Sequence, residues 1–391
     1  MEQFGIGDSG PGWPLARDNE TLNPRDGTEP MTRNLVWSFL MFCGFLTTAL
    51  RAEVVHVLAT DSAISFVGRW GPVEKGGQSS MVTVNGSSQI YLNFTGQNVS
   101  GLFDLDGIDC LEQVDVRVDG GAWSLFTIDR PRIQFFPTGL TRGRHRLEVA
   151  VKAVDSKAGR WLLPLRSAVV FRGFEIDSGA PLEDSSPSKR RPVLQFVGDS
   201  ITQGDGILRP SSAAVMNSDA LASYAWLAGE ALGTTHAQIA FAGQGVISSD
   251  SREVPPAMLS FAWNFTGSAA DFSLAPDFLV INLGSNDESA SSNEFVQAYI
   301  ALLQEIRKHC PRTVLFALRP FHGDRYHGDD VAQAVKIMAD PAVHYVDSTD
   351  WLDDRDFTDG THPNIPGSRK AAARLEEVLK PYVSNWKPRH E

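Results

Sequence analysis

The C-terminal half of the sequence holds a serine, a histidine and an aspartate whose local patterns suit nucleophilic catalysis. Ser200 follows the apolar run VLQFV within the segment GDSIT, and Asp359 and His362 lie three residues apart in DGTHP. A serine hydroxyl attacks a carbonyl well only when a base removes its proton, which an imidazole can do. A carboxylate beside the imidazole would hold its tautomer and stabilise the imidazolium. These residue types predict acyl transfer with Ser200 as nucleophile, His362 as base and Asp359 as the acid of a triad, without a metal ion or cofactor.

The tetrahedral intermediate of such a reaction carries a negative oxygen, which several hydrogen-bond donors must stabilise. The sequence offers the backbone N–H of Ser200, the backbone N–H of Gly243 in the segment AGQGV, and the side-chain amide of Asn286 in GSND. Gly245 lies in the same segment as Gly243 and is an alternative donor. Thr202 stands where the G-x-S-x-G elbow has its last glycine, so the segment is not that motif.

Apolar runs that predict buried strands precede these polar segments. The runs are VLQFVG (193–198), AQIAFAG (237–243), DFLVINLG (277–284), TVLFALRP (313–320) and VHYVD (343–347). Helical patterns alternate with them, and the clearest spans 293–309, where apolar residues recur at helical spacing. Continuous apolar strands separated by helices predict a parallel sheet covered on both faces. Because ligands bind beyond the carboxyl ends of the strands in such sheets, the polar segments should meet in one crevice.

The preceding part of the chain, residues 53–177, has the pattern of an all-β domain. Short alternating segments such as SSQIYLNF (87–94), VDVRVD (114–119) and RHRLEVAVKAV (144–154) are separated by turn sequences such as Asn85-Gly86. Many short strands with little helical periodicity predict a sandwich or jelly roll. The polar, Pro-containing segment 178–192 is the predicted linker to a catalytic domain over 193–391.

The first 52 residues form a predicted disordered extension and signal peptide. The uncharged run LVWSFLMFCGFLTTAL (35–50) is shorter than the ~20 residues needed to span a bilayer, and small residues follow it near a cleavage point. The acidic flank before it is unlike a signal n-region, so Met31 is the expected start. A membrane anchor is the alternative interpretation. Both place the rest of the chain outside the cytoplasm, and we expect a secreted, extracellular or periplasmic protein.

The four polar segments, in this order, resemble the SGNH (GDSL-type) hydrolase superfamily. That superfamily is named for the serine, glycine, asparagine and histidine found here as Ser200, Gly243, Asn286 and His362. The resemblance covers residues 192–381 and implies a three-layer α/β domain with a catalytic serine.

The N-terminal half narrows this resemblance. A β domain containing VGRW (67–70) and YLNFTG (91–96), joined by a short linker to a GDSIT-type hydrolase, is similar to carbohydrate esterase family 2. The resemblance implies a jelly roll before the SGNH domain and removal of O-acetyl groups from sugars, including 6-O-acetyl groups on hexosides and acetyl groups on xylan or mannan. Some members of that family use a Ser-His pair alone, so the need for Asp359 stays open.

Charge and cysteine content limit the partners. The chain has 35 Lys+Arg against 47 Asp+Glu, a formal charge of −12, which argues against binding a nucleic-acid backbone. Its three cysteines support neither a disulfide framework nor a cysteine-based zinc site. We expect a monomer with an acetylated carbohydrate as substrate, and no membrane contact beyond a possible signal anchor.

Other polar and aromatic residues have weaker patterns. Trp263, Phe321 and His322 are candidates for lining the substrate crevice, since they lie on loops beyond strands. A loop cluster could instead bind a metal; it comprises His322, Asp324, His327, Asp329 and Asp330. The acidic group Asp353, Asp354 and Asp356 is better explained as a solvated loop than as a glycosidase carboxylate pair.

The sequence therefore predicts a secreted carbohydrate O-acetylesterase. Two alternatives remain open: an esterase, lipase or peptidoglycan O-acetylesterase of the same superfamily, because the catalytic segments are shared across those activities, and a non-catalytic glycan-binding protein.

Overall fold

The computed structural model describes residues 54–156, 158–177, 180–182, 185–187, 191–209, 215–249, 253–273 and 275–388, which belong to one compact unit. The predicted extension and signal peptide over 1–52, and part of the predicted linker, lie outside the described residues. Within the described part of the chain, no helix has both the length and the apolar character that crossing a membrane requires.

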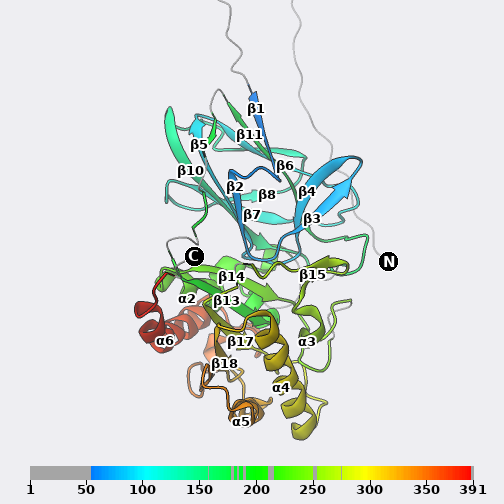
Figure 1. Cartoon of the computed structure of the whole chain (residues 1–391), viewed down its shortest axis with the longest axis vertical. Coiled ribbons are helices and arrows are strands. Elements are labelled where there is room, and N and C mark those ends of the chain that lie inside the picture. The colour runs from blue at the N-terminus through cyan, green and yellow to red at the C-terminus, as the bar shows by residue number, and fades with distance from the viewer. Residues whose placement is uncertain are drawn as a thin grey trace, which may run out of the picture. The chain divides into compact units, whose positions relative to one another are not determined.

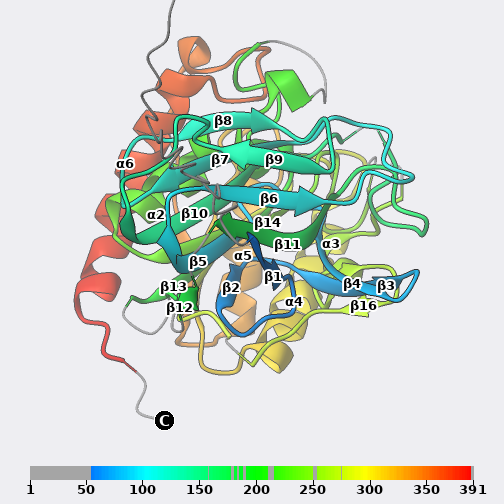
Figure 2. The same ribbon diagram turned by 90° about the horizontal axis from the view of Figure 1, so that it is seen from above.

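The N-terminal part, here called the β region, is a sandwich of two six-stranded antiparallel sheets (Figure 2). One sheet contains β1 (Val54–Leu58), β3 (Gly71–Lys75), β4 (Gln78–Thr83), β6 (Val99–Phe103), β9 (Arg132–Phe135) and β11 (Val169–Asp177). The other contains β2 (Ile64–Val67), β5 (Gln89–Gly96), β7 (Gln113–Val118), β8 (Ser124–Thr127), β10 (Gly143–Ala153) and β12 (Pro181–Leu182). The buried rings of Phe94, Phe103, Phe135 and Phe171 belong to one core shared by the sheets. The predicted all-β architecture is confirmed.

One strand lies inside the segment predicted as a linker. Pro181 and Leu182 form β12, which pairs with Phe94 and Asn93 of β5. A proline is tolerated there because β12 is the outer strand of its sheet, where one row of backbone groups needs no partner strand.

The C-terminal part, here called the α/β region, contains a five-stranded parallel sheet in the order β14-β13-β17-β18-β19. Its strands are β13 (Val193–Gly198), β14 (Thr235–Ala240), β17 (Phe278–Asn282), β18 (Val314–Leu318) and β19 (Val343–Val346). Helices α2 (Tyr224–Ala231) and α6 (Ile365–Ser384) share a core with one face of the sheet, and α4 (Ser292–His309) and α5 (Gly328–Met338) share a core with the other (Figure 1). The predicted parallel sheet between two helical layers is confirmed.

Helix α4 shows how local sequence sets an element. Ser291 and Glu294 form a reciprocal capping box that satisfies backbone N–H groups at its start. Buried Phe295, Tyr299 and Leu302 recur on one face, and the last turn carries three basic residues that suit the negative end of the helix dipole. The predicted helix at 293–309 therefore differs from α4 by one residue at its start.

The outer edge of β14 is covered by side chains of the β region. The Oδ1 atom of Asn85 accepts from the N–H of Ala240 at 3.0 Å, and the Oγ atom of Ser87 accepts from the N–H of Gln238 at 2.8 Å. The side-chain amide of Gln89 donates to the backbone oxygen of His236. Since β14 is the first strand of its sheet, these alternate residues stand in for a neighbouring strand and satisfy its open backbone groups.

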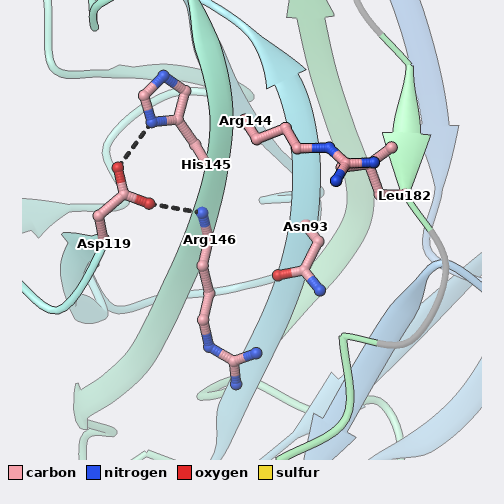
Figure 3. A pocket seen from close by; sticks show the side chains of 6 residues that line it. All are labelled: Asn93, Asp119, Arg144, His145, Arg146 and Leu182. Carbon is pink, nitrogen blue, oxygen red and sulfur yellow. Dashed lines mark hydrogen bonds and ion pairs between the residues drawn. The ribbon is translucent and has the colours of Figure 1, made fainter.

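A shallow hollow of about 380 Å³ lies on the β region (Figure 3). Its lining residues are Asn93, Asp119, Arg144, His145, Arg146 and Leu182. Asp119 joins two of them, since its carboxylate contacts the ring of His145 and accepts from the N–H of Arg146. All of its lining residues come from the β region, so the hollow is separate from the polar segments that follow the parallel strands.

Candidate active site

Ser200 stands at the start of the short helix α1 (Ser200–Gln203), directly beyond β13. Asp199 caps this helix, because its Oδ1 atom accepts from the N–H of Ile201 at 2.9 Å. Gly198 allows the sharp exit from the strand: a Cβ atom there would lie 2.1 Å from the hydroxyl of Thr202. The strand and the cap thus fix the serine at the carboxyl end of the sheet.

His362 reaches Ser200 from a loop that precedes α6. Its Nε2 atom lies 2.8 Å from the Oγ atom of Ser200, and its Nδ1 atom lies 2.8 Å from Oδ2 of Asp359. Asp359 also accepts from the backbone N–H groups of Thr361 at 3.1 Å and His362 at 2.9 Å. The three side chains predicted as a triad are therefore brought together in one continuous hydrogen-bonded chain.

The pKa of Asp359 reflects two opposing effects. Partial burial alone would raise it, but the hydrogen bonds from the His362 backbone and imidazole outweigh burial and lower the pKa below its ordinary value. The carboxylate therefore stays ionised at neutral pH, as a partner for an imidazolium must.

The loop after β14 carries both glycines that the sequence proposes as oxyanion donors. Gly243 adopts a left-handed conformation with φ of 78°. The N–H of Gly245 donates to the backbone oxygen of Ser248 at 2.8 Å, whereas the N–H of Gly243 has no hydrogen-bond partner within the described residues. Gly243 is thus the glycine whose N–H is left available for a ligand.

The side chain of Asp287 holds this loop through hydrogen bonds to its backbone. Its carboxylate accepts from the backbone N–H groups of Val246 at 2.8 Å, Ile247 at 2.9 Å and Ser248 at 3.1 Å. A Cβ atom at Gly245 would lie 2.4 Å from this carboxylate, so only glycine lets the loop approach it so closely. The carboxylate of Asp287, next to Asn286, therefore supports the loop that carries Gly243.

Asn286 joins the loop to the helix of Ser200. Its Nδ2 atom donates to the backbone oxygen of Gln244 at 3.0 Å and to Oδ2 of Asp199 at 3.2 Å. Asp199 is buried, and burial raises its pKa to about 6. The amide of Asn286 therefore lies between Asp199 and the loop after β14 and is hydrogen-bonded to both.

The three residues proposed to line the crevice have different surroundings. Trp263 is 40% exposed on β15 (Trp263–Phe265), which pairs with β16 (Ser268–Ala269). Phe321 packs edge-on against the ring of Tyr224 with centroids 5.1 Å apart. The ring of His322 lies 4.1 Å from that of Phe357, next to the loop of His362, and burial lowers its pKa. Of the three, His322 is the one with a contact to the loop that carries Asp359 and His362.

The loop cluster considered above as a metal site makes ion pairs with Arg319 and between its own members. Arg319 contacts Asp324 at 2.6 Å and Asp329 at 2.7 Å. His327 contacts Asp330 at 2.7 Å and the backbone oxygen of Asp287 at 2.9 Å. Among the residues that the structure describes, no group of three or more His, Cys, Asp or Glu is arranged to hold a metal ion. These side chains therefore support the loop beyond β18.

Sequence reasoning missed Gln203 and Tyr224. The side-chain oxygen of Gln203 accepts from the N–H of Ala242 at 3.1 Å, and the hydroxyl of Tyr224 lies 2.9 Å from that of Thr202. Gln203 sits one turn from Ser200, a proximity that could have singled it out. No local pattern marks Tyr224, whose partners are distant in sequence.

Comparisons with known proteins concern the α/β region in one case and both regions of the chain in another. Residues 196–370 match the model of the GDSL-like Lipase/Acylhydrolase family. No curated protein shows significant sequence similarity to the chain. The fold is similar to a family two carbohydrate esterase from Clostridium thermocellum in complex with cellohexaose, with 24% identity, 82% of this chain and 99% of that chain covered, and a TM-score of 0.67.

Two further solved structures share the whole two-part architecture. A family two carbohydrate esterase from Cellvibrio japonicus is 16% identical, with 85% of this chain and 99% of that chain covered and a TM-score of 0.69. An acetyl xylan esterase from the rumen bacterium Butyrivibrio proteoclasticus is 17% identical, with 85% and 99% covered and a TM-score of 0.66. At these identities the likeness establishes the fold alone, in which a β region precedes an α/β region with a parallel sheet.

Proposed function

We propose that this protein is a carbohydrate O-acetylesterase with Ser200 as its nucleophile, and the match of residues 196–370 to the GDSL-like Lipase/Acylhydrolase family model supports the proposal. The observation that carries the proposal is the chain of hydrogen bonds from the hydroxyl of Ser200 through the imidazole of His362 to Asp359. This arrangement favours catalysis over the purely glycan-binding role that the sequence left open, since binding alone does not require it.

The reaction proceeds in two halves. The Nε2 atom of His362 takes the proton of Ser200 while Oγ attacks the acetyl carbonyl, and Asp359 stabilises the resulting imidazolium. The imidazolium then gives its proton to the departing sugar oxygen as the C–O bond breaks, which leaves an acetyl group on Ser200. In the second half His362 takes a proton from water, whose oxygen attacks the acyl-enzyme, and acetate leaves as Ser200 regains its proton.

Three donors stabilise the oxyanion in this proposal. The N–H groups of Ser200 and Gly243 and the side-chain amide of Asn286 meet the negative oxygen as it forms. The available N–H of Gly243 supports that glycine over Gly245, whose own N–H is already bonded. Asn286 would share its hydrogens between the oxyanion and its present acceptors, Asp199 and Gln244.

The proposed substrates are acetyl esters of neutral sugars or plant polysaccharides such as xylan and mannan, with a 6-O-acetyl group as one possible position. Similarity in fold to an acetyl xylan esterase and to an esterase that binds cellohexaose supports this class. We also propose that the protein is exported through the apolar segment 35–50 and acts as a monomer. Lipid esters and peptidoglycan O-acetyl groups are the competing substrates.

The direct test of the reaction replaces the nucleophile. Ser200→Ala should abolish acetate release from 4-nitrophenyl acetate, because it removes the hydroxyl that is hydrogen-bonded to Nε2 of the His362 imidazole. The melting temperature of the variant should stay close to that of the wild type, which separates lost chemistry from lost folding. Retention of most of the activity would refute the assignment of Ser200.

The substrate class needs a separate experiment. Acetate release should be measured from regiochemically defined acetylated monosaccharides, acetylated xylan and mannan, O-acetylated peptidoglycan and a long-chain lipid ester. We expect the highest kcat/KM on an acetylated neutral sugar. A higher value on peptidoglycan or lipid ester would move the protein to another activity of the same superfamily while leaving the mechanism intact.

A further inference from the structure

A buried arginine of the β region reaches the α/β region beside its catalytic helix. Arg160 belongs to the connection between β10 and β11, yet its Nη2 atom donates to the side-chain oxygen of Gln203, the last residue of α1, at 2.8 Å. Its guanidinium lies 4.9 Å from the ring centroid of Phe241, and only 2% of the residue is exposed. The β region therefore contributes a cation to the interior of the α/β region.

Gln203 passes this contact on to the loop of Gly243. Its side-chain oxygen, which accepts from Arg160, also accepts from the N–H of Ala242 at 3.1 Å. The bond fixes the Phe241–Ala242 peptide, which directly precedes the Ala242–Gly243 peptide that carries the oxyanion donor. One amide oxygen thus connects the β region, the helix that begins at Ser200 and the loop after β14.

The cost of burying Arg160 argues that the contact does more than fill space. Burial lowers its pKa to about 10, which still leaves the side chain charged at neutral pH. Its Nε and Nη1 atoms have no hydrogen-bond partner in the described part of the chain. The charges of Asp205, Glu112 and Asp155 favour its ionised form, but they do not satisfy these two donors. An apolar side chain of similar size is often as good for stability as such a buried cation.

We propose that Arg160 is a positioning residue for the acyl-transfer site: through Gln203 it holds the Phe241–Ala242 peptide, and so orients the following Ala242–Gly243 peptide with the N–H of Gly243 toward the forming oxyanion. Donors aimed in advance at the negative oxygen need no rearrangement during the reaction, and a charged hydrogen bond orients Gln203 more firmly than a neutral one. The β region is then part of the catalytic apparatus. The inference rests on the proposed esterase function.

Two variants interrupt the connection at its two ends. In Arg160→Met and in Gln203→Leu, kcat for 4-nitrophenyl acetate should fall by roughly 10-fold to 10²-fold, somewhat less than the loss of a whole oxyanion donor. KM should change by less than about 3-fold, since the contact acts on the transition state rather than on substrate binding. Gln203→Glu should stay within about 3-fold of the wild-type kcat, because a carboxylate can accept from both Arg160 and Ala242.

A matched control separates positioning from general support between the two regions. Lys152 is another buried cation of the β region, and its Nζ atom donates to the backbone oxygen of Ser218 at 2.8 Å without touching the Gly243 loop. Lys152→Met should lower the melting temperature and leave kcat within about 2-fold of wild type. The double variant Arg160→Met with Gln203→Leu should be no slower than the slower single variant, because both remove one connection.

The rate at which a fluorophosphonate labels Ser200 gives a second readout, which needs no natural substrate. It should fall in Arg160→Met by about the same factor as kcat, because the phosphoryl oxygen uses the same donors. Folded Arg160→Met with wild-type kcat and labelling would overturn the positioning role alone. The positioning role would also be overturned if kcat fell in proportion to the melting temperature in both Lys152→Met and Arg160→Met, and if Gln203→Glu did not keep the wild-type kcat. A wild-type protein that neither hydrolyses 4-nitrophenyl acetate nor becomes labelled would refute the esterase function itself.

Discussion

Asn286, the side chain proposed as an oxyanion donor, already makes two hydrogen bonds within the protein. Its Nδ2 atom donates to Asp199 and to the backbone oxygen of Gln244, so it connects the cap of α1 with the loop after β14 in the absence of substrate. These contacts fix the position of the amide, and in the proposed mechanism one of the two hydrogen bonds must be shared or exchanged when Nδ2 meets the oxyanion. The same contacts mean that removing the side chain affects both the oxyanion and the loop.

Replacing this amide should therefore be costly. Asn286→Ala should lower kcat for 4-nitrophenyl acetate by roughly 10²-fold to 10³-fold, the range seen when an oxyanion donor is removed. The measurement is steady-state kinetics alongside thermal unfolding, which reports how far the loop has been weakened. A loss of kcat below threefold in a folded variant would assign the donor role to other groups.

Asp359 has two functions that one substitution can separate. Its Oδ1 atom accepts from the backbone N–H groups of Thr361 and His362, and its Oδ2 atom faces Nδ1 of the imidazole. Asp359→Asn keeps a carbonyl oxygen for the backbone bonds but removes the charge that stabilises the imidazolium.

For a complete triad, Asp359→Asn should lower kcat by up to about 10⁴-fold. Asp359→Ala serves as the comparison, because it also removes the backbone bonds and should lower the melting temperature further. If Asp359→Asn loses less than about tenfold, the enzyme works with Ser200 and His362 as a pair.

At the scale of elements, the edge of β14 depends on side chains rather than on a partner strand. Asn85, Ser87 and Gln89 meet three backbone groups of β14 on one side, at the spacing of a strand. This cover blocks the edge that a parallel sheet would otherwise expose to other chains. It also secures the strand that leads into the Gly243 loop.

Loss of one of these hydrogen bonds should lower the free energy of unfolding and leave kcat nearly unchanged. Ser87→Ala leaves the buried N–H of Gln238 without an acceptor, which should cost about 1 to 3 kcal/mol of unfolding free energy. Urea denaturation measures the change, and kcat of the folded variant should stay within about 2-fold. Ser79→Ala, whose hydroxyl contacts Glu74 at the surface, should change stability by less than about 0.5 kcal/mol. Equal effects of the two substitutions would refute the structural role of the edge cover.

The sequence predicted the bounds of a strand well where the local residue pattern determines them. It predicted them less well where contacts with distant parts of the chain determine them. The run 193–198 coincides with β13, but the run 237–243 is displaced from β14, which begins at Thr235 and ends at Ala240. His236 and Gln238 look too polar for a buried strand, yet the β region supplies partners for their backbone groups. Gly243 is turned out of the strand by its left-handed conformation.

The same division applies to the site. Ser200, His362, Asp359, Gly243 and Asn286 could be proposed because each follows a predicted strand, and strand ends converge. Arg160 and Ser87 could not, because no local pattern tells which part of a β sandwich will face another region of the chain.

At the scale of the whole molecule, the β region serves the α/β region in two ways. It covers the edge of β14, and it places Arg160 against Gln203. Both contacts lead to the loop of Gly243, one through the strand before it and one through Ala242. A substitution deep in the β region can therefore change catalysis without touching substrate.

Glu112 makes the stability of the β region depend on pH. It is 2% exposed, accepts from the hydroxyl of Ser167 at 2.7 Å and from the N–H of Asp155 at 3.1 Å, and burial raises its pKa from 4.5 to about 7. A carboxyl group whose pKa is higher in the folded than in the unfolded state favours folding in its protonated form. Its contribution is complete below about pH 4.5 and is lost as pH rises to about 7.

Glu112→Gln removes this titration while keeping the shape of the side chain. The variant should gain stability relative to the wild type as pH rises from about 4.5 to 7, and the difference should level off above that. The size is at most about 3.5 kcal/mol, since one pKa unit corresponds to about 1.4 kcal/mol and the pKa rises from 4.5 to about 7. Chemical denaturation of both proteins at several pH values measures it, and titrating groups that do not interact with Glu112 cancel in the comparison. A stability difference that does not vary with pH, or that falls as pH rises, would show that the carboxylate of Glu112 is satisfied in its ionised form.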